Sequence, residues 1–167
     1  MSVAALIPVE QYLNTSYSPD CEYVDGVLVE RSAGASPHSQ VQSNIVFALR
    51  SRYRNLRVWP EQRVQVSDSR FRIPDICVTD GHPRTRIFDT PPLIAIEILS
   101  RDDSLPLLQR KIDEYLGFGI PNVWVIDPWN TTAYVCEPAA IRKVTSGFLE
   151  VSEPAILVPL AEIFDLD

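Results

Sequence analysis

Two carboxylates stand out in the 167-residue sequence because each lies within a mostly apolar run of strand length. Asp75 lies in the segment 72–78, RIPDICV, and Glu97 lies in the segment 93–100, LIAIEILS. A buried, ionised carboxylate is unfavourable unless a cation or a metal ion compensates its charge. On neighbouring strands the two carboxylates would offer the oxygen ligands that Mg²⁺ prefers, with its other positions left to water and a substrate phosphate. Such an ion could stabilise a leaving oxygen and help to generate a hydroxide nucleophile.

The same two acids also have a purely structural interpretation, in which Asp75 ends a strand after a proline and Glu97 forms a salt bridge in the core. Lys111 favours the chemical interpretation. It lies three residues after Leu108 and four before Tyr115, so it flanks the apolar face of a predicted helix and could reach the sheet near Glu97. There a lysine would orient an attacking water and offset phosphate charge, although lysines on such flanks are usually just solvated.

A histidine begins the first long helical pattern. His38 lies three residues before Val41 and seven before Ile45, so it shares their inward face, although it could simply cap the helix. Because a helix N-terminus disfavours the imidazolium, we expect His38 to be neutral near pH 7.

Two acids near the N-terminus could supply a third carboxylate. Glu22 and Glu30 flank Asp25-Gly26, a dipeptide that strongly predicts a hairpin turn. The turn explains Asp25 by itself. Glu22 and Glu30 could equally be ordinary exposed strand acids, and Glu30 is the nearer of the two in sequence to the segment before His38.

The elements that must position these residues follow a mixed α/β order. Helical periodicity predicts helices over about 8–13 and 37–55, and a third that starts after Ser104 and is closed by Gly117 and Gly119. Besides the hairpin over 22–30, we expect strands over 57–60, 62–67, 72–79, 93–99, 123–126, 132–136, 141–145 and 149–158.

Composition narrows the class of protein. The length favours one domain over residues 1–167, and no apolar run approaches the ~20 residues of a membrane span. The three cysteines, Cys21, Cys77 and Cys136, are far apart and odd in number, which favours reduced thiols in a cytoplasmic protein. The sequence has only two histidines, which argues against a His-rich or Cys-rich zinc site.

Charge gives a divided signal about nucleic acid. The net charge of −7 argues against a protein that coats nucleic acid nonspecifically. Four arginines nevertheless cluster in a short region: Arg50, Arg52, Arg54 and Arg57. They could contact phosphates, or they could decorate an exposed helix end, where cations favour the C-terminal dipole.

Several short motifs, taken in order, resemble the Uma2 family of the PD-(D/E)XK nuclease superfamily. The motifs are EYVDG at 22–26, SPH at 36–38, PD at 74–75, EILS at 97–100 and GIPNVWVID at 119–127, with Lys111 and Tyr115 before the last. The likeness covers about 17–135, most of the chain. Each motif is weak by itself, and their order and spacing make the resemblance specific.

The resemblance implies a restriction-endonuclease-like mixed β-sheet core flanked by helices, with an N-terminal β-hairpin. It also implies that Asp75 and Glu97 bind Mg²⁺. The wider superfamily has its lysine two residues after the second acid, and Leu99 stands there in this chain. The Uma2 resemblance instead places the lysine on the following helix, at Lys111, and places His38 where the superfamily often has an acid.

Two further departures concern residues near the proposed site. Arg101 follows Ser100 where the family commonly has a proline, and Leu107 stands where it commonly has an aspartate. Neither removes a proposed ligand.

The expected function is therefore a Mg²⁺-dependent endonuclease that hydrolyses DNA phosphodiester bonds, with Mn²⁺ able to substitute. Asp75, Glu97, Lys111 and His38 are its expected catalytic residues. By analogy we also expect a homodimer, because duplex cleavage needs two active sites and the apolar tail 155–158 could form a surface. The alternatives are a catalytically silent nuclease fold that serves binding or assembly and, less favoured, a phosphatase acting on small phosphoesters.

Overall fold

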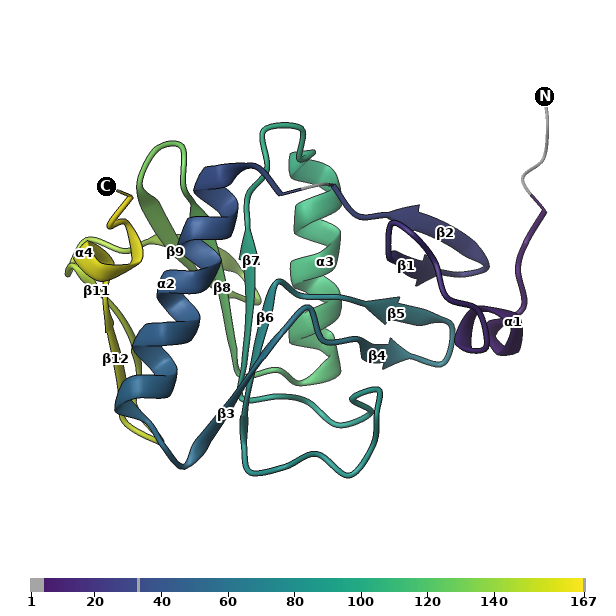
Figure 1. The fold of residues 1–167 in the computed structure, drawn as a ribbon, viewed down its shortest axis with the longest axis horizontal. Helices are drawn as coiled ribbons and strands as arrows, with labels where there is room; N and C mark the ends of the chain where they lie inside the picture. Colours follow the sequence, from purple (N-terminus) through teal and green to yellow (C-terminus); the bar gives the residue numbers. More distant parts are fainter. Residues whose placement is uncertain (1–4, 33, 167) are drawn as a thin grey trace.

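A six-stranded mixed sheet forms the centre of the computed structural model, which describes residues 5–32 and 34–166 (Figure 1). Its strand order is β10-β9-β8-β7-β6-β3. The strands are β3 (Leu56–Pro60), β6 (Ile76–Asp80), β7 (Ile94–Ile98), β8 (Asn122–Asp127), β9 (Thr132–Glu137) and β10 (Ala140–Lys143). Strands β7 and β8 pair in parallel, and the other neighbours pair antiparallel. The parallel pair requires a crossover, which α3 (Leu105–Phe118) supplies.

Two helices cover the two faces of this sheet (Figure 1). Helix α2 (Ser36–Arg52) packs Val41, Ile45 and Leu49 against a face that includes Ile96. Helix α3 packs against the opposite face. Because side chains alternate along a strand, Glu97 points away from the α2 face and towards α3.

A second sheet lies beside the first, in the strand order β2-β1-β5-β4. Its strands are β1 (Cys21–Val24), β2 (Val27–Glu30), β4 (Val64–Ser67) and β5 (Arg70–Arg72). The predicted hairpin is confirmed, since β1 pairs with β2 around Asp25 and Gly26, which have φ angles of 49° and 91°. Helix α1 (Val9–Leu13) packs Tyr12 on Tyr23 and Phe71 at the outer end of this sheet.

The strand predicted over 72–79 is wrong in one respect, because the chain changes sheets within it. Strand β5 ends at Arg72 in the second sheet, and β6 begins at Ile76 in the central sheet. Pro74 has no N–H for a ladder hydrogen bond, and the N–H of Ile73 donates to a side chain, Oε1 of Glu22. The link therefore joins the two sheets and carries Asp75 at their junction.

The C-terminal region also differs from the prediction of one strand over 149–158. It forms a separate hairpin of β11 (Phe148–Val151) and β12 (Ile156–Pro159), followed by the short helix α4 (Leu160–Ile163). Ile156 and Val158 are buried in the core under α2, and Leu157 is 43% exposed. The tail therefore packs mainly inward and does not offer the apolar surface that we expected. The homodimer itself stays a prediction.

The remaining sequence expectations concern cysteines and membrane spans. All three cysteines are buried and free. In the ranges 5–32 and 34–166, no helix combines the length and the apolar character needed to cross a membrane.

Two glycines of the α3 region should respond oppositely to alanine. Gly119 caps α3 with φ of 101°, so Gly119→Ala should lower the free energy of unfolding by about 1–2 kcal/mol through backbone strain. Gly117 lies inside the helix with open space where a Cβ would be, so Gly117→Ala should raise the free energy of unfolding by about 0.8–1 kcal/mol. Urea unfolding of both variants tests the pair, and shifts of equal sign would contradict the assignment of the helix end.

Candidate active site

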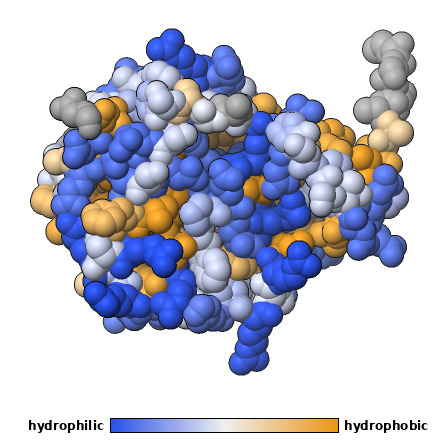
Figure 2. All heavy atoms as spheres, viewed as in Figure 1, coloured by the Kyte–Doolittle hydropathy of each residue, from blue (hydrophilic) through white to orange (hydrophobic). Residues whose placement is uncertain are grey.

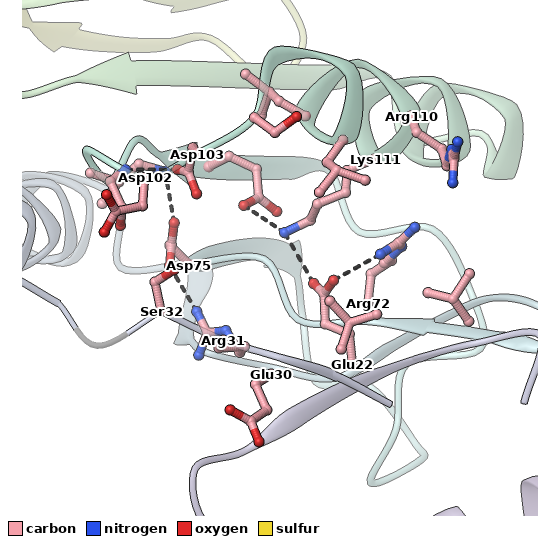
Figure 3. Close-up of a pocket in the computed structure, with 18 of the residues that line it drawn as sticks. Glu22, Glu30, Arg31, Ser32, Arg72, Asp75, Asp102, Asp103, Arg110 and Lys111 are labelled. Carbon is pink, nitrogen blue, oxygen red and sulfur yellow. Dashed lines mark hydrogen bonds and ion pairs between the residues drawn. The ribbon is translucent and has the colours of Figure 1, made fainter. Parts of the chain in front are cut away.

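The predicted site residues gather around a cavity of about 450 Å³ where the two sheets meet the beginnings of α2 and α3 (Figure 3). Its walls come from the β1–β2 hairpin, the link between β5 and β6, the end of β7 and the first turns of α3. Sequence-distant segments therefore supply one polar pocket.

Asp75 lines this pocket and is buried. The β6–β7 register pairs Ile76 with Ile96, so continuing it by one residue places Asp75 opposite Glu97. Oδ2 of Asp75 accepts a hydrogen bond from the N–H of Ile98 at 2.7 Å. Oδ1 lies 2.8 Å from Nη2 of Arg31 and 3.3 Å from Nε2 of His38. Burial by itself would raise the pKa of Asp75, but these donors and cations outweigh it and hold the pKa below its usual value.

The expectation that His38 is neutral is not supported. The hydrogen bond to the Asp75 carboxylate raises the pKa of His38 above its ordinary value, although burial opposes this. The contact with a nearby carboxylate outweighs the more diffuse field of the helix N-terminus.

Glu97 is 7% exposed, and two side chains of α3 hold it. Lys111 donates from Nζ to Oε2 at 2.9 Å, and Tyr115 donates from its hydroxyl to Oε1 at 2.6 Å. The two donors are four residues apart, which places them one above the other on the helix. Burial raises the pKa of Glu97 to about 7 in spite of Lys111, since the charges of Asp75 and Glu22 oppose its ionisation.

Lys111 also connects the two sheets (Figure 3). Its Nζ lies 3.0 Å from Oε1 of Glu22 on β1, so one ammonium stands between Glu22 and Glu97. Burial would lower the pKa of Lys111, but the two carboxylates raise it, and the side chain is charged. The lysine contact that helical spacing suggested is thus present.

The ion pairs continue from Glu22 to a buried arginine. Oε2 of Glu22 lies 2.8 Å from Nη1 of Arg72, and Nε of Arg72 donates to Oε2 of Glu114 on α3 at 2.6 Å. Burial raises the pKa of Glu22, yet the cations Lys111 and Arg72 and the N–H of Ile73 bring it below its usual value. This chain of charges ties the second sheet to α3.

The structure brings together most of the residues selected from the sequence. Asp75, Glu97, Lys111, His38 and Glu22 form one connected cluster. Glu30 lines the cavity but is exposed, and its side chain points away from Lys111 (Figure 3).

Sequence reasoning missed four members of the cluster: Arg31, Arg72, Glu114 and the hydroxyl of Tyr115. Glu114 lies three residues after Lys111, so its helical position could have indicated that it faces the same way. Tyr115 was recognised as a core residue, without its bond to Glu97.

The donor set fits a Mg²⁺ ion with few protein ligands. Among the described residues, no group of three or more His, Cys, Asp or Glu is arranged to hold a metal ion. Mg²⁺, however, is commonly held by one or two carboxylates together with water. Oδ2 of Asp75 and both Oε atoms of Glu97 each accept one hydrogen bond, which leaves each a second acceptor position. Asp75 and Glu97 are therefore suitable ligands.

Arg72 should matter more for stability than an exposed arginine. Arg72→Met removes the cation that Glu22 and Glu114 share. Because Lys111 and Arg70 still contact these acids, the cost should be about 3 kcal/mol of unfolding free energy, the lower end for a broken buried pair. Arg52→Met removes a solvent-exposed pair with Glu162 and should cost at most about 1 kcal/mol. Urea unfolding compares the two, and equal costs would show that the buried chain of charges is not structurally important.

Comparisons with known proteins identify the family and the fold. The model of the Uma2 family, described as "Putative restriction endonuclease", matches residues 9–163. A crystal structure of a "putative nuclease belonging to DUF820" from Anabaena variabilis ATCC 29413 superposes with a TM-score of 0.80 and 24% identity, covering 96% of this chain and 98% of that one. A search of curated proteins finds no match. The structural likeness confirms the restriction-endonuclease-like fold, and the family match confirms the predicted resemblance: the chain belongs to the Uma2 family.

Proposed function

We propose that the protein is a Mg²⁺-dependent endonuclease that hydrolyses DNA phosphodiester bonds. The observation that carries the proposal is the position of Asp75 opposite Glu97 in an open polar cavity, with the Lys111 ammonium 2.9 Å from Glu97. Membership of a family described as restriction endonucleases supports the choice of a nucleic acid substrate.

Asp75 and Glu97 would hold the ion, and bound Mg²⁺ would supply charge stabilisation at the leaving oxygen and a more acidic water. Lys111 would hold the attacking water beside the phosphorus and offset the phosphate charge. Tyr115 and His38 are positioning residues: the hydrogen bond from Tyr115 orients Glu97, and the His38 imidazole, 3.3 Å from Oδ1, orients Asp75. Arg31 is near enough to Asp75 to meet a phosphate oxygen once that carboxylate engages the ion.

One observation favours a second candidate, a catalytically silent fold that serves binding or assembly. Protein cations already compensate the acids: Arg31 and His38 contact Asp75, and Lys111 contacts Glu97. A purely structural ionic core would have the same arrangement. Metal binding therefore separates the two candidates.

Neutral isosteres of the two acids should abolish cleavage. Asp75→Asn and Glu97→Gln remove the charged ligands, so each should reduce nicking of supercoiled plasmid in Mg²⁺ or Mn²⁺ by at least about a hundredfold. Glu150→Gln, at an exposed position of strand β11, is the matched control and should cleave like the wild type. Nicking that is undiminished in both site variants would refute the mechanism.

Removal of the Arg31 charge should strengthen metal binding. The guanidinium lies 2.8 Å from Oδ1 of Asp75 and opposes a second cation there, so Arg31→Gln should tighten Mn²⁺ binding by about tenfold. Titration calorimetry measures the effect. Arg84→Gln, in an exposed loop, serves as the control for the change in net charge.

The same titration decides between the candidates. Titration of Asp75→Asn with Mn²⁺ should give no heat of binding. If neither the wild type nor Arg31→Gln bound Mn²⁺, the silent fold would be the better description.

A further inference from the structure

A second hollow lies at the opposite end of α2 from His38, where the helix ends and β3 begins. It has a volume of about 520 Å³, and the residues that line it include Arg50, Arg54, Arg57, Trp59 and His82. Three arginines thus face one space in a protein whose net charge is −7.

These arginines are poorly compensated by acids. In the ranges 5–32 and 34–166, no carboxylate lies within ion-pair distance of Arg50, Arg54 or Arg57. Arg57 instead donates from Nε to Nε2 of His82 at 2.9 Å and from Nη1 to the carbonyl of Arg54 at 3.0 Å. Cations that line one hollow repel one another, and an anion in the hollow would relieve that repulsion.

The helix dipole accounts for only part of the cluster. Arg50 and Arg52 lie in the last turn of α2, where a cation is favourable, and Arg52 pairs with Glu162. Arg54 and Arg57 lie beyond the helix, so the dipole does not explain why they share the hollow with Arg50.

The hollow lies within reach of a polynucleotide bound at the acids. His38 and Arg50 are at opposite ends of α2, and at 1.5 Å per residue they are about 18 Å apart along its axis. The β3–β6 ladder gives a similar span, since Pro60 pairs with Ile76 beside Asp75 and Leu56 pairs four residues further on, about 13 Å away. Duplex DNA covers such a span in about four to five base pairs.

The exposure of the arginines favours a polymer over a small anion. Arg50 and Arg54 are exposed, and Figure 2 shows strongly hydrophilic residues gathered over the C-terminal end of α2. Exposed charges bind a single small anion weakly because solvent screens them. Several of them together contribute substantially to binding a polymer with many phosphates, through release of its counterions.

We propose that this hollow, the arginine cleft, binds backbone phosphates of the nucleic acid a few base pairs from the bond that is cleaved. The inference rests on the proposed function for the identity of the polymer. The recognition is electrostatic and guanidinium-based, so it should be largely independent of base sequence.

Equilibrium binding of a fluorescein-labelled 20-base-pair duplex in EDTA tests the cleft without any cleavage. The double variant Arg50→Ala/Arg54→Ala removes two cations, so the negative slope of log K against log salt should become shallower by about 1.8, with about tenfold weaker binding at about 0.1 M salt. The matched control is Arg142→Ala/Lys143→Ala on β10, the opposite edge of the sheet, which removes the same charge and should leave the slope unchanged.

The outcomes separate the cleft from the proposed hydrolysis. An arginine-dependent slope supports the cleft even if the wild type never cleaves DNA. If the wild type cleaves DNA and both double variants have the same salt slope as the wild type, the proposal for the arginine cleft is wrong and the proposed hydrolysis is unaffected. The cleft proposal is also wrong if the arginine variant has a lower thermal stability but an unchanged salt slope. The same holds if the arginines affect the binding of inorganic phosphate but not the affinity for the duplex.

Discussion

The site depends on one buried ammonium that stands between two carboxylates from different sheets. Nζ of Lys111 is 3.0 Å from Glu22 on β1 and 2.9 Å from Glu97 on β7. Burying an ion costs several kcal/mol unless partners compensate it, so each of these three charges needs the others. The two sheets and α3 are consequently held in one relative position, and that position also creates the cavity.

The segment in which the chain crosses from the second sheet to the central sheet supplies the other acid of the site, Asp75. Pro74 ends the pairing of β5, and the next residue, Asp75, enters the cavity before β6 begins. Its carboxylate accepts a hydrogen bond from the N–H of Ile98, the last residue of β7. The Asp75 side chain thus satisfies a backbone N–H that the pairing of β6 with β7 leaves free. The same contact fixes Asp75 relative to Glu97. One hydrogen bond therefore satisfies a buried backbone donor and also orients a carboxylate that we propose as a Mg²⁺ ligand.

Strand composition and helical spacing made Asp75, Glu97, Lys111 and His38 candidates, and the family resemblance selected them as a set. Local patterns could not identify Arg31 as the partner of Asp75, since 44 residues separate the two and only the pairing of the sheets brings them together. The raised pKa of His38 has the same origin, because its partner Asp75 is also distant in the sequence. The break at Pro74, by contrast, could have been predicted from the missing N–H, and the single strand expected over 149–158 ignored the turn that divides it.

The absence of lysine at position 99 also has a physical explanation. Leu99 shares the side of the sheet that Glu97 and Ala95 face, and it packs with the cluster formed by Ile112 and Tyr115 of α3. This position therefore helps to hold α3 against the sheet, and α3 in turn brings Lys111 to Glu97. An ammonium from the strand itself would reach the acid without help from tertiary structure. Here the position of the ammonium depends on the packing of the helix, so core contacts under α3 determine where Lys111 meets Glu97.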